Sequence, residues 1–197
     1  EIGSRIVGSE MCIRDSLQIE KARRLDITEE VYFDIIRRKT ASLLAACGAC
    51  GAASAGADDD TVQKMWGLGE RVGLAFQIQD DLLDLGEGDR TGKPTGQDIR
   101  ERKMTLPLIH TLAKATPSQR RRLIRLVKHK SEDPAAVKEV MDAILAGPGM
   151  ERARSEMRRL KEESLALLDE LGGHDAVSTE AREALRDLIE YTIRRVK

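Results

Sequence analysis

From Leu17 to the end of the chain, apolar residues recur at three- and four-residue spacing, in segments separated by short connectors. This spacing is typical of helices with one buried face, whereas a half-buried strand alternates apolar and polar residues. Only 3% of the residues are aromatic, while alanine, leucine, glutamate and arginine are abundant, which favours helices over sheets. Helices joined by short connectors pack into bundles, so we expect an all-α helical bundle.

Start and stop signals divide the chain further. Thr28, Asp58 and Thr116 are placed to cap the helices that follow them, and Pro134 stands at the first turn of another helix. Pro107 should either bend its helix or begin a new one. The expected helices span roughly 29–56, 61–85, 99–114, 117–130, 134–146, 150–171 and 178–196. We expect Met65 and Trp66 to lie in the core.

Length and composition exclude several classes of protein. The 197 residues suffice for one domain with a real core, and the net charge of −1 argues against a nucleic-acid partner. No apolar stretch approaches the roughly 20 residues of a membrane-spanning helix, so no integral membrane segment is expected. Three cysteines, an odd number, suggest a reducing compartment, for which the cytoplasm is the default.

The first sixteen residues, EIGSRIVGSEMCIRDS, show neither helical nor strand periodicity. Within them, VGSEMCIRDS resembles the in-frame translation of a transposase adapter used in preparing sequencing libraries. We therefore expect residues 1–16 to be a non-native, adapter-derived segment and residues 17–197 to be what remains of the native domain. On this interpretation, native chain of unknown length is missing before Leu17. A genuine but irregular terminus is the alternative.

The stretch FQIQDDLLD at residues 76–84 places three carboxylates in an otherwise apolar helix. Asp80, Asp81 and Asp84 are three or four residues apart, so we expect their carboxylates to converge on one face, with Gln77 one turn earlier. Carboxylates so close repel one another and need a compensating cation. Mg²⁺ fits, because it prefers oxygen ligands and commonly bridges carboxylates to substrate phosphates.

Basic residues surround this stretch in the sequence. Lys93 lies in a glycine-rich loop, and Asp98 and Lys103 follow it. Lys39 and Thr40 precede a segment of small residues that would permit close approach of a helix or a ligand. Lysines bind phosphate as point charges, so carboxylates for a metal and lysines from two other segments indicate a diphosphate site.

The motifs FQIQDDLLD, GKPTGQD and KMTLP together resemble the second aspartate-rich region of trans-isoprenyl diphosphate synthases, the polyprenyl synthetase family. Lys39-Thr40 stands where that family has a Lys-Thr pair, and the resemblance covers essentially residues 17–197. It implies the helical bundle of the isoprenoid-synthase type, with the N-terminal helices missing. It also implies Mg²⁺-assisted condensation of an allylic diphosphate with isopentenyl diphosphate, and a homodimeric full-length protein.

The resemblance also implies roles for individual residues. Asp80, Asp81 and Asp84 would hold Mg²⁺ against the allylic diphosphate, and Asp98 would orient the basic loop. The residues expected to contact the diphosphate or stabilise the developing cation are Lys39, Thr40, Gln77, Lys93 and Lys103.

Two departures from the family pattern stand out. The sequence has a single DDxxD motif and lacks the family's first aspartate-rich region and the residues that bind isopentenyl diphosphate, so we expect the chain to be inactive alone. Arg102 stands where the family often has glycine. Nothing in the sequence sets the length of the product.

Other interpretations stay open. The carboxylates could form a solvated acidic stripe. The chain could be a non-catalytic helical partner of an active subunit, or a terpene-cyclising enzyme of the same fold. Cys47 and Cys50 match a C-x-x-C pattern, but small-residue helix packing explains them better than metal or redox chemistry. The basic segment 120–130 is interpreted as a solvent-facing side of an amphipathic helix.

Overall fold

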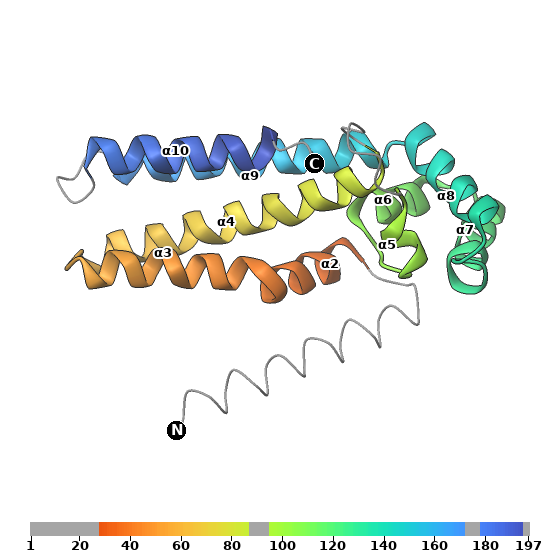
Figure 1. Cartoon of the computed structure of the whole chain (residues 1–197), viewed down its shortest axis with the longest axis horizontal. Helices are drawn as coiled ribbons and strands as arrows, with labels where there is room; N and C mark the ends of the chain where they lie inside the picture. Colours follow the sequence, from red (N-terminus) through yellow and green to blue (C-terminus); the bar gives the residue numbers. More distant parts are fainter. Residues whose placement is uncertain (1–27, 87–94, 172–177, 195–197) are drawn as a thin grey trace, which may run out of the picture.

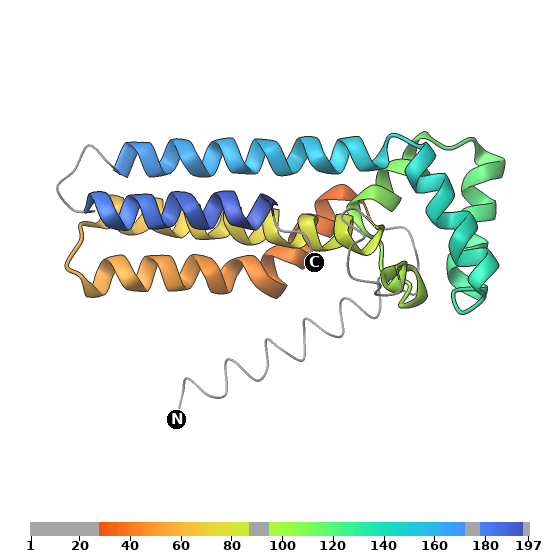
Figure 2. The same cartoon turned by 45° about the horizontal axis from the view of Figure 1, so that its top comes forward.

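The computed structural model describes residues 28–86, 95–171 and 178–194, and the regular structure within these ranges is helical. This confirms the all-α prediction. Figures 1 and 2 show α3, α4, α9 and α10 running side by side in a long body, with α5 to α8 gathered at one end. The elements are α2 (Glu29–Ile36), η1 (Arg37–Ala41), α3 (Ser42–Ser54), α4 (Asp59–Asp84), α5 (Gln97–Arg100), α6 (Leu106–Lys114), α7 (Pro117–His129), α8 (Pro134–Ala146), α9 (Gly149–Leu171) and α10 (Thr179–Arg194).

Helix starts follow the predicted signals. The Asp58 side chain accepts a hydrogen bond from the Thr61 amide at 2.8 Å, and Thr116 forms a capping box with Gln119. Pro107 begins a new helix, because the chain leaves helical geometry after Arg100 and α6 starts only at Leu106. In the first turn its missing N–H has no helical partner to lose. The single helix expected over 99–114 is therefore two helices.

A π-helical turn, η1, joins α2 to α3 and carries Lys39 and Thr40. Buried residues are four positions apart in α2, at Tyr32 and Ile36, and again four positions apart from Ala41 onward through α3. Between Ile36 and Ala41 the step is five. The wider turn takes up the extra residue, so one buried face continues through all three elements.

Glycines bring α3 and α4 into direct backbone contact. A Cβ atom on Gly73 would lie 2.5 Å from the Ala41 Cα, and one on Gly69 would lie 2.5 Å from the Leu44 carbonyl oxygen. A Cβ on Gly48, on the α3 side, would lie 2.7 Å from the Met65 carbonyl oxygen. The small residues after Thr40 thus serve the approach of a neighbouring helix.

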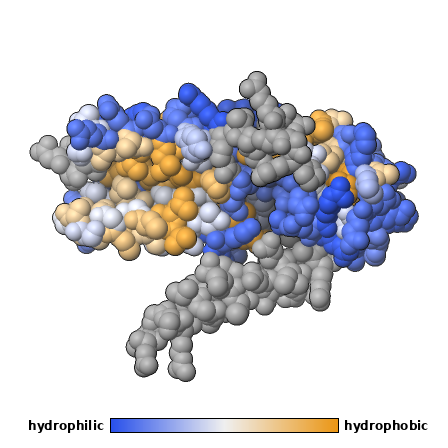
Figure 3. Space-filling model, in the orientation of Figure 1, coloured by the Kyte–Doolittle hydropathy of each residue, from blue (hydrophilic) through white to orange (hydrophobic). Residues whose placement is uncertain are grey.

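The apolar core has a large cluster around α4, α6 and α9 and a smaller one formed by Leu68, Val72, Leu168 and Ile189. Apolar side chains also reach the surface, as a band between α10 and α3 in Figure 3. Exposed large apolar residues include Leu43, Trp66, Leu145, Leu188 and Tyr191.

Two expectations about the core were wrong. Trp66 lies on α4 and is 42% exposed. Cys47 and Cys50 are also exposed, so Gly48 and the neighbouring alanines, not the cysteines, provide the helix packing. Among the described helices, none is long and apolar enough to span a bilayer.

The α3–α4 contact can be tested with two glycine substitutions. We expect Gly73→Ala to lower the free energy of unfolding by about 1–3 kcal/mol, because the added methyl group meets backbone atoms that cannot rotate away. Gly51→Ala is the matched control, since no atom lies within 4 Å of its Cβ position. It should raise stability by about 0.5–1 kcal/mol through helix propensity. Urea unfolding measures both, and equal effects would contradict the close contact.

Candidate metal and diphosphate site

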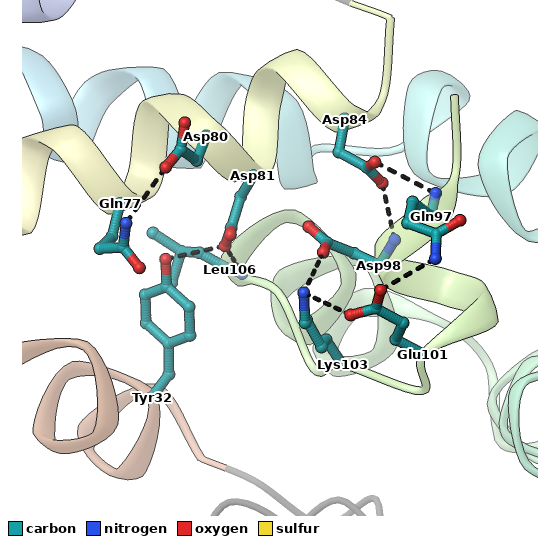
Figure 4. A network of polar contacts seen from close by, with 10 residues as sticks. All are labelled: Tyr32, Gln77, Asp80, Asp81, Asp84, Gln97, Asp98, Glu101, Lys103 and Leu106. Carbon is teal, nitrogen blue, oxygen red and sulfur yellow. Dashed lines mark hydrogen bonds and ion pairs between the residues drawn. The ribbon is translucent and has the colours of Figure 1, made fainter. Parts of the chain in front are cut away.

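The three carboxylates of α4 turn toward different partners (Figure 4). Asp80 accepts a hydrogen bond from Gln77 Nε2 at 3.1 Å, Asp81 accepts one from Tyr32, and Asp84 lies against the start of α5. Asp80 and Asp81 project about 100° apart around the helix axis. Within the described ranges no three carboxylate, histidine or cysteine side chains form a metal-binding group. The three aspartates lie within one turn of α4, and their joint ligation of a metal ion stays a prediction.

Asp81 is held at one oxygen by two donors. The Tyr32 hydroxyl donates to Oδ2 at 2.8 Å, and the Leu106 amide donates to the same atom at 3.3 Å. Burial raises the pKa of Asp81 to about 7, with nearby Asp98 and Asp80 adding to the rise and the two hydrogen bonds opposing it. Burial, together with the Asp81 charge, also raises the pKa of Tyr32 well above its usual value.

Asp84 ties the end of α4 to the start of α5. Its Oδ1 accepts from the Gln97 amide at 3.1 Å, its Oδ2 from the Asp98 amide at 3.0 Å, and its carbonyl oxygen from the Gly96 amide at 2.8 Å. Gly96 has φ of 78°, and a Cβ there would lie 2.8 Å from the Met141 Sδ. Metal ligation by Asp84 stays a prediction.

Lys103 is placed between two carboxylates. Its Nζ lies 2.9 Å from Asp98 Oδ1 and 2.6 Å from Glu101 Oε2. Burial acts to lower the pKa of Lys103, but hydrogen bonds to Glu101 and Asp98 outweigh it, so the pKa is raised and the ammonium stays charged. The site thus includes a fixed cation beside Asp98.

The remaining predicted residues come from η1 and the loop. Lys39 is exposed and Thr40 half-buried. The positive charge of Lys39 contributes to lowering the pKa of Glu101, after hydrogen bonds from Lys103 and Gln97, which places Lys39 near the Lys103 cluster. Lys93 lies outside the described residues.

Sequence reasoning missed Tyr32, Glu101 and the Leu106 amide. Tyr32 stands seven residues before Lys39, in an amphipathic helix whose buried positions are otherwise apolar. A buried tyrosine usually finds a partner for its hydroxyl group, and this is the signal that could have singled it out.

The donor set fits Mg²⁺ in its chemistry. Oxygen atoms dominate the site, and the raised pKa of Asp81 indicates negative charge that the surrounding protein does not fully compensate. Mg²⁺ often takes only one or two carboxylates and completes its coordination with water and substrate phosphate. Two or more of these aspartates could therefore hold the ion without forming a complete cage.

Comparison with known proteins identifies the family. Residues 4–144 match the model described as Polyprenyl synthetase. The chain belongs to the polyprenyl synthetase family. Its sequence is 36% identical to nonaprenyl diphosphate synthase of Mycobacterium tuberculosis over 170 residues, which cover 84% of this chain and 48% of the relative. The chain thus spans about half the length of this curated relative.

Solved structures of the family share the fold. A decaprenyl diphosphate synthase from Rhodobacter capsulatus superposes with a TM-score of 0.85 at 31% identity, covering 96% of this chain and 57% of that one. A polyprenyl synthase from Caulobacter crescentus, complexed with calcium and isoprenyl diphosphate, gives a TM-score of 0.83 at 28% identity, covering 96% and 56%. The helical fold of the isoprenoid-synthase type is thereby confirmed.

The buried charge of Asp81 has a consequence for stability. Its folded-state pKa of about 7 lies above the ordinary aspartate value of 3.8, so stability falls as the pH rises from about 4 to about 7. Asp81→Asn removes the charge while its amide oxygen can still accept from Tyr32 and Leu106. Without metal, we expect the variant to melt roughly 4–8 °C above the wild type at pH 8, with a smaller gain at pH 5.

Thermal unfolding in EDTA at both pH values measures this effect. Asp142→Asn is the control, because Asp142 is an exposed residue paired with Lys138. Its melting temperature should change little at either pH. A gain for Asp81→Asn that is equal at pH 5 and pH 8 would show that the buried charge is not its source.

Arg102 adopts a backbone conformation that favours glycine. Its φ is 57°, at the position just after α5 where the chain turns Lys103 back toward Asp98. Its Nε also donates to Ser131 Oγ at 3.2 Å. Arg102→Gly and Arg102→Ala both lose this bond, but only glycine relieves the strain. We expect the glycine variant to be more stable than the alanine variant by about 1 kcal/mol in urea unfolding. Equal stability would mean that the turn is not strained.

Proposed function

We propose that this chain carries part of the active site of a trans-prenyltransferase, which condenses an allylic diphosphate with isopentenyl diphosphate to extend a trans-polyprenyl diphosphate. Family membership supports this proposal. The observation that carries it is the cluster in which Lys103 pairs with Asp98, whose charge in turn helps to raise the pKa of Asp81, while the charge of Lys39 acts on Glu101. Carboxylates for a metal and cations for phosphate from separate elements are what diphosphate binding needs.

In this proposal Asp80, Asp81 and Asp84 hold Mg²⁺ against the diphosphate of the allylic substrate. The ion would supply positive charge that stabilises the departing diphosphate. The calcium and isoprenyl diphosphate named for the Caulobacter crescentus protein support a divalent cation at such a site in this family.

The basic residues act on the leaving group. Lys103, held by Asp98 and Glu101, has its charge fixed before substrate arrives, so little reorganisation is needed when negative charge grows on the diphosphate. Lys39 lies on η1 with its side chain exposed. The residues proposed to contact the diphosphate or stabilise the allylic cation are Lys39, Thr40, Gln77, Lys93 and Lys103.

The reaction itself needs two substrates. The allylic carbon–oxygen bond breaks and the electron pair leaves with the diphosphate. The double bond of isopentenyl diphosphate then attacks the allylic cation, and loss of a proton gives a product longer by one isoprene unit.

Further elements of the proposal concern the whole protein. A second aspartate-rich region and the residues for isopentenyl diphosphate would come from outside this sequence, which has one DDxxD motif. We also propose a homodimeric full-length protein, because exposed apolar side chains such as Leu188 and Tyr191 indicate contact with further polypeptide. A cytoplasmic location is also proposed, because Cys47 and Cys50, the cysteines of residues 17–197, are free thiols in the structure.

The test separates binding from turnover. With Mg²⁺, an allylic diphosphate and isopentenyl diphosphate, we expect no elongated product from this chain, because half of the site is absent. Calorimetry should nevertheless detect Mg²⁺-dependent binding of inorganic pyrophosphate. Lys39→Gln should weaken that binding roughly tenfold, the loss of one charged hydrogen bond of about 1.5 kcal/mol.

Lys138→Gln provides the control, because Lys138 pairs with Asp142 on the surface of α8. It should bind pyrophosphate as the unmodified chain does. Elongated product above background would overturn the expected inactivity. Absence of Mg²⁺-dependent pyrophosphate binding would overturn the proposed site.

A further inference from the structure

Tyr32 reaches the carboxylates from an element that none of the sequence motifs includes. It lies in α2, is only 4% exposed, and its hydroxyl group donates to Asp81 Oδ2 at 2.8 Å across a separation of 49 residues. Figure 4 shows its ring rising from α2 toward α4, with the hydroxyl group directed at Asp81.

We propose that Tyr32 is a positioning residue that holds Asp81 with one carboxylate oxygen occupied and the other available to a metal ion. This inference rests on the proposed function, because it concerns how the same metal site is prepared. Tyr32 contacts neither metal nor substrate in this proposal.

The geometry of the donors carries the argument. The Tyr32 hydroxyl and the Leu106 amide both donate to Oδ2, from α2 and from the start of α6. Two donors from different elements hold Oδ2 in place and thereby restrict rotation of the carboxylate. Oδ1 is then the atom that would bind a cation.

The chemistry of the donor matters as well. A phenol is neutral, so it orients Asp81 without neutralising it, whereas a lysine in the same place would compete with the cation. Tyr32 is buried, so water cannot readily replace its hydroxyl group. Hydrogen-bond donors behind a metal ligand typically contribute a factor of about 10–100 to metal affinity.

Tyr32 also connects the two halves of the site. It lies on the helix that continues into η1, where Lys39 and Thr40 are found. Its bond to Asp81 therefore fixes the carboxylate half of α4 relative to the turn that carries the basic residue.

The test is Tyr32→Phe in the full chain. We expect the Mg²⁺ concentration that half-saturates pyrophosphate binding to rise at least tenfold, because Asp81 can then rotate. Tyr191→Phe is the matched control, since Tyr191 is the other tyrosine of the chain and is 66% exposed. It should leave the Mg²⁺ requirement unchanged.

A double-mutant cycle separates positioning from general support of the fold. If Tyr32 acts through Asp81, Tyr32→Phe should not weaken Mg²⁺ binding further in an Asp81→Asn background. Additive losses in the double variant would overturn the proposal, because they would show that Tyr32 acts independently of Asp81.

A second measurement needs no substitution. In protein labelled with 3-fluorotyrosine, ¹⁹F spectra contain one signal from Tyr32 and one from Tyr191. Mg²⁺ with pyrophosphate should shift the Tyr32 signal and leave that of Tyr191 in place. An unmoved Tyr32 signal while calorimetry detects binding would overturn the positioning role alone. Absence of any Mg²⁺-dependent binding would overturn the proposed function together with it.

Discussion

The contact of α3 with α4 at Gly69 and Gly73 determines where the site can form. Because these glycines have no side chain, the backbones meet at Ala41, the last residue of the turn that carries Lys39 and Thr40, and at Leu44 just beyond it. That turn is thereby brought beside the half of α4 that bears the aspartates. A side chain at Gly73 would separate the basic and acidic parts of the site as well as weaken the packing.

Much of the fold could be predicted from the sequence, because its signals are local. The spacing of apolar residues, the Asp58 cap and the Thr116 capping box each involve neighbours within one turn, and all three lie where expected. The π-helical turn was not predicted. In the sequence this turn corresponds to a spacing of five residues between the buried positions Ile36 and Ala41. That spacing could not be recognised, because alanine is common on every face of a helix and does not identify a buried position.

The candidate site was predictable in its residue types but not in its geometry. Helical spacing placed Asp80, Asp81 and Asp84 within one turn, yet Asp81 and Asp84 accept hydrogen bonds from other segments, while Asp80 accepts one from Gln77 on its own helix. Those donors include the amides of Gln97, Asp98 and Leu106, and backbone groups leave no mark in a sequence. Tyr32 was missed for a related reason. Its partner Asp81 is distant in the chain, and the neighbouring residues of α2 have the pattern of an ordinary apolar helix face.

The uncompensated charge of Asp81 is the feature that would suit a cation. A phenol and a backbone amide orient this carboxylate but bring no positive charge, and burial beside Asp98 leaves its ionised form destabilised. Lys103 instead forms ion pairs with Asp98 and Glu101. Keeping this uncompensated carboxylate buried therefore lowers the free energy of unfolding of the protein. A divalent cation would offset that penalty, so in the proposed function the raised pKa of Asp81 and the binding of metal have the same electrostatic origin.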